Sequence, residues 1–281
     1  MTEKKSVAII GLGWLGLPLA KSLQQQGYTV KGSTTTPEKA AQLINQGIDA
    51  QMVRFEPAPT VDLGDLLAVD AVVINIPPKA GMQGDAFHPQ QIGYLVDAIR
   101  KQGARHIIYV SSTSVYPEQT EPVRPSVEDD VQTPAQSAAP ALVEAEQKVL
   151  TLAPERLVTI LRCGGLMGYE RIPGKYVAGK TVDTGTVPVN YIHRDDVIGL
   201  LSTILANKLP GTFNAVAPEH PTREAIYRKS CADFGYELPT FVTPDKPLAY
   251  KVISPDKLIQ ATKYHFSYSN PLDFPYGSGA Q

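Results

Sequence analysis

A short apolar strand near the N-terminus runs directly into three regularly spaced glycines, Gly11, Gly13 and Gly16. The expected strand covers residues 7–10, and a helical pattern covers residues 15–26. In such a unit the first glycine permits a tight turn, the second lets the backbone approach a pyrophosphate, and the third lets the helix pack against the strand. The amino end of the helix then offers free N–H groups and a positive dipole to a diphosphate. The motif predicts a dinucleotide site, although a glycine-rich turn in an ordinary βα unit is the alternative. The residues expected to contact the dinucleotide here are Gly11, Gly13, Trp14, Leu15 and Gly16.

Composition excludes several other classes of protein. The net charge of −2 provides no basic surface for nucleic acid or for a membrane. The three glycines and Pro18 are not typical of a secretory signal, and no stretch approaches the roughly 20 apolar residues that span a bilayer. Cys163 and Cys231 lie far apart without metal-ligand spacing, and the histidines form no cluster with carboxylates. We therefore expect a cytoplasmic protein that binds no metal.

Strands and helices alternate along the first half of the chain. Continuous Val and Ile runs indicate strands that are buried on both faces, as in a parallel sheet. The alternation predicts an α/β fold, a doubly wound parallel sheet of the NAD(P)-binding Rossmann type with right-handed crossovers. The expected strands cover residues 7–10, 28–32, 50–55, 70–76, 106–110 and 157–161, and the expected helices cover residues 15–26, 37–46, 90–102 and 141–152.

The second half of the chain is less regular. A helix is expected at residues 194–206, a strand at 211–215 and another helix at 223–234. These segments suggest a smaller lobe over the carboxyl edge of the sheet, where ligands bind in such folds. We expect a dinucleotide-binding core at residues 1–162. Residues 163–281 are expected to form an interleaved, small C-terminal substrate-binding lobe that also completes the core.

The end of the second expected strand discriminates between the two nicotinamide nucleotides. NAD-selective folds place an Asp or Glu there to hold the ribose 2′-hydroxyl. No acid occurs in residues 33–36, and a carboxylate would repel a 2′-phosphate, so we predict NADP rather than NAD. The same stretch could also cap the next helix, through Thr36. The expected donors to a 2′-phosphate are Ser33, Thr34, Thr35, Lys31 and Lys39.

Four further stretches carry a family resemblance. The first resembles a strand with an "SS…VYG" turn, and the others resemble "R…G..YGP", "IHVDDV" and "L..lGy.f" segments. Together with the glycine motif they are similar to the extended short-chain dehydrogenase/reductases, which form the NAD-dependent epimerase/dehydratase superfamily. The closest resemblance is to its short, atypical YeeZ-like members, which have a reduced substrate lobe. The stretches are residues 109–116 (YVSSTSVY), 162–168 (RCGGLMG), 190–197 (NYIHRDDV) and 257–266 (KLIQATKYHF).

The resemblance implies an NADP-dependent oxidoreductase or epimerase that acts on a small polyol, sugar or carbonyl compound. Ser112 aligns with the catalytic Ser or Thr of the family, whose hydroxyl bonds to the substrate oxygen. The alternative for Ser112 is a strand-end hydroxyl that satisfies loop backbone. Cofactor contacts are also expected at the ends of the fourth, fifth and sixth strands. These residues are Asn75, Ile76, Pro77, Ser111, Cys163 and Gly164.

The chain departs from the family at its acid/base pair. Active members carry Tyr-x-x-x-Lys, in which the lysine lowers the tyrosine pKa for proton exchange with the substrate. Alignment on Glu146 places Ala138 at the tyrosine position and Leu142 at the lysine position. By resemblance, Asp196 and His193 are expected to brace the junction of the lobes rather than to do chemistry. The candidates for a replacement acid are Tyr116, Tyr169, Tyr176, Tyr191 and His193.

The missing pair leaves a second function open. A non-catalytic module could bind NADP(H) and report its redox state to a partner. Retention of the substrate-lobe segments favours the enzyme over this alternative. The expected partner is a small-molecule substrate, and the chain is expected to be a monomer or a homodimer.

Overall fold

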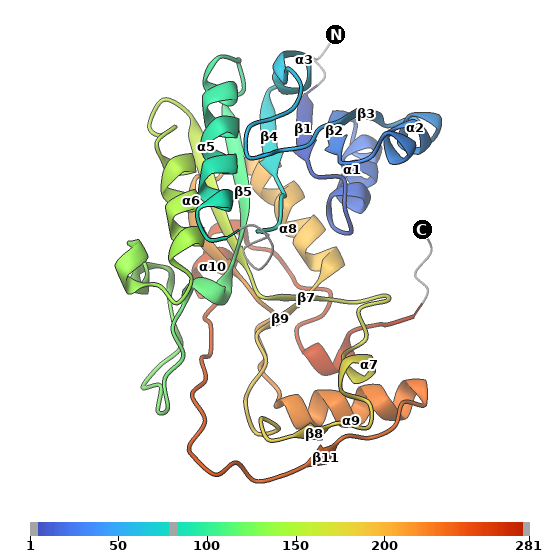
Figure 1. The fold of residues 1–281 in the computed structure, drawn as a ribbon, viewed down its shortest axis with the longest axis vertical. Helices are drawn as coiled ribbons and strands as arrows, with labels where there is room; N and C mark the ends of the chain where they lie inside the picture. The colour runs from blue at the N-terminus through green and yellow to red at the C-terminus, as the bar shows by residue number, and fades with distance from the viewer. Residues whose placement is uncertain (1–4, 79–83, 278–281) are drawn as a thin grey trace.

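A seven-stranded parallel sheet forms the centre of the computed structural model, which describes residues 5–78 and 84–277 (Figure 1). The spatial order is β3-β2-β1-β4-β5-β6-β10, so the order reverses between β1 and β4. In doubly wound sheets ligands bind outside the carboxyl ends of the strands at such a reversal. The fold class predicted from the sequence is confirmed. The strands are β1 (Ser6–Ile10), β2 (Thr29–Thr34), β3 (Asp49–Met52), β4 (Ala71–Ile74), β5 (His106–Ser112), β6 (Leu157–Cys163) and β10 (Gly211–Ala215).

Helices cover both faces of this sheet. Val7 and Ile9 of β1 belong to the apolar cluster formed with α1, α2, α8 and α10, whereas Ala8 and Ile10 belong to the cluster formed with α3, α5 and α6. Because side chains alternate between the faces of a strand, both sets must be apolar when both faces are covered. The helices are α1 (Gly16–Gln25), α2 (Pro37–Asn45), α3 (Gly64–Leu67), α5 (Phe87–Arg100), α6 (Pro140–Leu150), α8 (Arg194–Asn207) and α10 (Asp256–Thr262).

A smaller lobe lies beyond the carboxyl ends of the strands (Figure 1). Its short strands pair as β7 with β9 and β8 with β11, and α7 packs against α9. The chain reaches this lobe several times, because residues after Cys163 also supply α8, β10 and α10 to the sheet and its helical layer. The elements of the lobe are β7 (Gly165–Met167), α7 (Pro173–Val177), β8 (Thr181–Val182), β9 (Tyr191–His193), α9 (Arg223–Phe234) and β11 (Thr240–Phe241).

Asp196 ties the C-terminal segment to the first turn of α8. Its fully buried carboxylate accepts hydrogen bonds from the Tyr264 hydroxyl at 3.1 Å, the Ser267 amide at 2.7 Å and the Tyr268 amide at 3.2 Å. His193 is also fully buried, among the rings of Tyr268 and other aromatic residues. Both side chains are thus engaged in packing.

Several boundaries differ from the sequence-based expectation. The second strand continues to Thr34, and the third strand ends at Met52 rather than at residue 55. Pairing with a neighbouring strand sets these limits, because β2 and β3 remain in register as far as Thr34 and Met52. The short elements α3, α7, β7, β8, β9, β11 and α10 were not expected. Within the described ranges, none of the helices is long and apolar enough to cross a membrane.

Candidate cofactor and substrate site

The three glycines after β1 have three different surroundings. Gly11 has φ +110°, and a Cβ there would lie 2.5 Å from the Asn75 carbonyl oxygen. A Cβ at Gly16 would collide with the Gly11 carbonyl, because α1 packs closely on the turn. A Cβ at Gly13 would meet no atom within 4 Å. The outer glycines are therefore required by the fold, whereas Gly13 leaves open space.

The open space at Gly13 is lined by hydrogen-bond donors. Within the described residues, the amide groups of Gly13, Trp14 and Leu15 have no acceptor. They stand at the amino end of α1, where N–H groups and the helix dipole favour an anion. Asn75 Nδ2 donates to the Gly11 carbonyl oxygen at 3.1 Å and holds the turn against the end of β4. This arrangement fits the diphosphate of a dinucleotide.

A cavity of about 350 Å³ extends from this turn along the carboxyl ends of β4, β5 and β6. Most of the cofactor-binding residues predicted from the sequence line this cavity, and so does Ser112. Gly11 and Gly16 shape the turn behind it, and Ser33, Thr34 and Thr35 are not among its lining residues. The predicted residues that line it are Gly13, Trp14, Leu15, Asn75, Ile76, Pro77, Ser111, Ser112, Cys163 and Gly164.

The predicted donors at the end of β2 have different surroundings in the structure. Ser33 and Thr34 are buried, and the Ser33 hydroxyl accepts a hydrogen bond from the Gly11 amide at 3.1 Å. Lys31 forms an ion pair with Asp65 at 3.0 Å, so its ammonium points away from this edge. Thr36 occupies the position before α2, but its side chain accepts no hydrogen bond from the helix. Of the hydroxyl-bearing residues, Thr35 and Thr36 are exposed at the edge.

Arg54 is a candidate binding residue that the sequence analysis missed. It follows β3, and its Nε donates to the Thr35 carbonyl oxygen at 3.0 Å. The guanidinium is exposed and has no carboxylate partner within the described residues. An arginine in this place can accommodate a 2′-phosphate. The parallel-sheet pattern could have identified Arg54, because residues after adjacent strands meet at the same edge.

Arg171 is a second missed cation, and it lines the cofactor cavity. Its guanidinium stacks over the Trp14 ring at 3.8 Å from the centroid, and Nη1 donates to the Leu166 carbonyl oxygen at 3.3 Å. Burial lowers the pKa of Arg171, which still stays charged. Trp14 therefore both lines the cavity and packs at the junction of the lobes. No local sequence pattern predicts that Arg171 lines the cavity, because its loop reaches the glycine turn only in the folded chain.

A buried polar network lies beneath the cavity. The Ser111 hydroxyl donates to Glu146 Oε1 at 2.6 Å, so this predicted cofactor residue is already hydrogen-bonded. Glu146 also forms an ion pair with Arg162, in which Arg162 Nη2 lies 2.7 Å from Glu146 Oε2. Both side chains are 3% exposed. Arg162 Nη1 donates to the Tyr116 hydroxyl at 2.9 Å. The network fixes the ends of β5 and β6 against α6.

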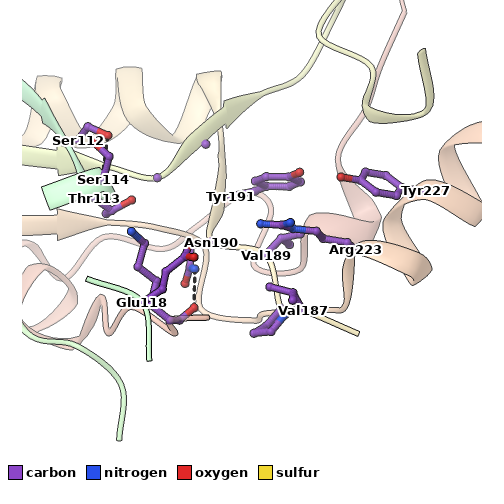
Figure 2. A pocket seen from close by; sticks show the side chains of 14 residues that line it. Ser112, Thr113, Ser114, Glu118, Val187, Val189, Asn190, Tyr191, Arg223 and Tyr227 are labelled. Carbon is purple, nitrogen blue, oxygen red and sulfur yellow. Dashed lines mark hydrogen bonds between the residues drawn. The ribbon is translucent and has the colours of Figure 1, made fainter. Parts of the chain in front are cut away.

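A second cavity, of about 400 Å³, opens toward the smaller lobe (Figure 2). Ser112 and Gly164 line both cavities, so the two meet at these residues. The Ser112 hydroxyl oxygen accepts the Ser114 amide at 3.1 Å, which leaves its own proton available to a ligand. The other residues lining the second cavity are Thr113, Ser114, Glu118, Gly165, Val187, Pro188, Val189, Asn190, Tyr191, Arg223, Tyr227 and Lys251.

Among the described residues that line the two cavities, no tyrosine and lysine occupy the positions of the resembling family's acid/base pair. Leu142 lines the cofactor cavity at the position aligned with the lysine. Ala138, aligned with the tyrosine, lies before α6, where its amide donates to the Val115 carbonyl oxygen at 3.0 Å. Cys163 is no substitute, because burial raises the pKa of its thiol to about 12.

Among the candidates for a replacement acid, only Tyr191 lines the substrate-side cavity. Burial raises the pKa of Tyr191, so its hydroxyl stays protonated and can donate a hydrogen bond. Tyr116 is buried against Asn214, and Tyr169 bonds to Asp195. Tyr176 is exposed and outside both cavities.

Comparison with known proteins identifies the family. The model of a family described as NAD(P)H-binding matches residues 11–208. The chain belongs to the NAD(P)H-binding family. Protein YeeZ of Escherichia coli (strain K12) is 37% identical over 275 residues, which cover 96% of this chain and 99% of YeeZ. The resemblance to YeeZ-like proteins predicted from the sequence is confirmed.

Solved structures of epimerases share the fold of this NAD(P)H-binding protein. ADP-L-glycero-D-manno-heptose-6-epimerase of Helicobacter pylori superposes with a TM-score of 0.76 at 16% identity, over 97% of this chain and 95% of that chain. A variant of UDP-glucuronic acid 4-epimerase from Bacillus cereus, in complex with UDP-4-deoxy-4-fluoro-glucuronic acid and NAD, superposes with a TM-score of 0.75 at 18% identity, over 96% of both chains. These likenesses show that the chain shares the fold of these epimerases.

No group of His, Cys, Asp or Glu side chains in residues 5–78 and 84–277 could hold a metal ion. Both cysteines are free and buried. The side chains that line the two cavities offer hydroxyl, amine, guanidinium and carboxylate groups.

Proposed function

We propose that this NAD(P)H-binding protein is an NADP-dependent oxidoreductase or epimerase that acts on a small polyol, sugar or carbonyl substrate. The observation that carries the proposal is the meeting of the two cavities at Ser112 and Gly164. A cofactor held at the glycine turn and a substrate held by the smaller lobe would come together there. Residues 163–281 would then supply the substrate-binding lobe. The free cysteines agree with a cytoplasmic location.

Residues in the cofactor cavity and after β3 would hold different parts of the dinucleotide. The free amides at Gly13, Trp14 and Leu15 would hold the diphosphate, and Arg171 adds a positive charge beside them. A bound nicotinamide nucleotide supplies or accepts a hydride at a carbon of the substrate. Arg54 would hold the 2′-phosphate that distinguishes NADP from NAD, because its guanidinium can bind phosphate through two parallel hydrogen bonds.

Arg54→Ala is expected to weaken NADPH binding by about 10- to 100-fold, the effect of losing charge-assisted hydrogen bonds. NADH binding should stay unchanged, because NADH lacks the 2′-phosphate. Titration of both nucleotides, followed by nicotinamide fluorescence, measures the two affinities on one sample. The NADPH affinity of Arg54→Lys should lie between that of Arg54→Ala and that of the natural protein. An equal loss for NADPH and NADH would exclude Arg54 as the selective residue.

Ser112 would act on the substrate. Its hydroxyl oxygen is held by the Ser114 amide, so its proton can point toward a carbonyl or alkoxide oxygen in the substrate-side cavity. A donor that is fixed before the reaction stabilises the negative charge that develops on this oxygen. Tyr191 can supply a further hydrogen bond to the substrate from its protonated hydroxyl.

Ser112→Ala is expected to lower kcat/KM by about 100-fold, which is typical for loss of one such donor. The measurement is NADPH oxidation with a panel of small aldehydes, ketones and keto sugars. Ser112→Thr keeps a hydroxyl and should retain most of the activity. NADPH affinity serves as the control for folding. Full activity of Ser112→Ala would remove this residue from the mechanism.

A specific observation favours the non-catalytic alternative. Leu142 places an apolar side chain in the cofactor cavity at the position aligned with the family's lysine. A module that binds NADP(H) and reports its redox state needs no acid/base pair. Tight NADPH binding without turnover of any compound in the panel would favour this alternative over the enzyme.

A further inference from the structure

We propose that the substrate-side cavity takes a small molecule with a carboxylate or phosphate group, and that Arg223 binds this anionic group. The inference rests on the proposed function, and it names the substrate class of the same site. Arg223 lies at the far end of the cavity from Ser112 (Figure 2). The anionic group would therefore be remote from the reacting carbon.

The surroundings of Arg223 provide the main argument. The residue begins α9, and its backbone amide donates to the Val187 carbonyl oxygen at 2.9 Å. Its side chain is half-buried, but within the described part of the chain the guanidinium makes no hydrogen bond or ion pair. Figure 2 shows Arg223 reaching into the cavity near Tyr191 and Tyr227. Cations that leave bulk water are normally paired, so the partner of this guanidinium is expected to come from the ligand.

The other charges of the cavity support an anionic ligand. Lys251 is half-buried, and its ammonium donates to the Tyr116 carbonyl oxygen at 2.6 Å. The lining thus carries two cations, Arg223 and Lys251, against the single carboxylate of Glu118. Glu118 is exposed at the rim, where water screens its charge. The charged side chains of the lining therefore include one more cation than anion.

The neutral side chains of the cavity narrow the ligand further. The side-chain amide of Asn190 is already hydrogen-bonded within the protein. Its Nδ2 donates to the Lys251 carbonyl oxygen and its Oδ1 accepts the Ile253 amide, both at 2.9 Å. Tyr191 and Tyr227 present hydroxyl groups and ring faces beside Arg223. The volume of about 400 Å³ is near the lower end of ligand cavities. A compact ligand with one anionic end and hydroxyl or carbonyl groups fits these features.

Binding of simple anions to the NADPH-saturated protein tests this inference. Saturation with NADPH prevents the added anions from binding at the free amides of Gly13, Trp14 and Leu15. Malonate and inorganic phosphate are titrated separately, with the uncharged malonamide as reference, and the melting temperature is followed. We expect at least one anion to stabilise the protein and malonamide to have no effect. The anion that binds more tightly indicates whether the substrate carries a carboxylate or a phosphate.

Variants on one helix provide the control. Arg223→Gln should weaken anion binding by about 10-fold or more, as expected for loss of a charged hydrogen-bonding partner. Arg228→Gln removes the same charge from α9 but lies outside the cavity, paired with Glu224 at 2.7 Å, and should bind as the natural protein does. Equal losses in both variants, or no anion binding, would overturn the inference.

The nucleotide titration separates this inference from the proposed function. Normal NADPH binding without anion binding would refute the anionic substrate and leave the cofactor assignment intact. Absence of NADPH binding would refute the proposed function, and the inference would fail with it. NADPH binding that is unchanged in Arg223→Gln also shows that the variant is folded.

Discussion

Gly13→Val is expected to raise the dissociation constant for NADPH at least about 100-fold, equivalent to about 3 kcal/mol, while the protein stays folded. The backbone at Gly13 needs no positive φ, and a Cβ there meets no atom within 4 Å. A valine side chain would therefore fit the free protein. It would occupy the space beside the free amides, where the diphosphate is expected. Fluorescence titration measures the affinity, and thermal unfolding shows whether the fold persists.

Gly11→Ala is the matched control for this variant. Its Cβ would lie 2.5 Å from the Asn75 carbonyl oxygen, at a residue with φ +110°. The strain is expected to cost roughly 1–3 kcal/mol of unfolding free energy. The two glycine variants should thus separate loss of affinity from loss of stability. Binding of NADPH to Gly13→Val with the natural affinity would refute the dinucleotide site.

Arg162→Met is expected to lower the free energy of unfolding by about 3–5 kcal/mol, the usual effect of leaving one member of a buried ion pair without its partner. Arg162 holds Glu146 through Nε and Nη2, and both residues are 3% exposed. It also donates to the Tyr116 hydroxyl and to the carbonyl oxygens of Glu128 and Val131. Urea denaturation followed by circular dichroism measures the loss.

A double variant tests the cause of this loss. Arg162→Met combined with Glu146→Leu removes both charges, so no carboxylate stays buried without a partner. We expect the double variant to be more stable than Arg162→Met alone, because an apolar pair of similar volume replaces an ion pair at little cost. A single variant that loses less than about 1 kcal/mol would show that water or another group compensates the carboxylate.

Much of the fold follows from local pattern. The strands of the parallel sheet appear as short Val- and Ile-rich runs, because helices cover both of their faces. The helix at residues 223–234 was predicted with the bounds that α9 has in the structure. The short strands of the smaller lobe were not predicted, since two or three residues carry too little periodicity.

The candidate site was predictable where it depends on one continuous segment. The turn at Gly11–Gly16 is such a segment, and so are the polar residues that follow β4 and β5. The surroundings of the predicted 2′-phosphate donors at the end of β2 were not evident from the sequence, because the burial of Ser33 and Thr34 depends on the neighbouring strands. In the structure, Ser33 bonds to the Gly11 amide across the neighbouring strand.

The sheet, the glycine turn and the absence of the usual tyrosine and lysine follow from the sequence, because each depends on residues that are neighbours in the chain. Which polar groups stay free depends on the tertiary structure. Arg171 and Arg223 each line one of the two cavities, and Arg54 lies beside Thr35 after β3, so the three arginines come from separate segments of the chain. These segments come together only when the chain folds into the sheet and the smaller lobe. Burial then determines which side chains are paired within the protein and which are left for a ligand.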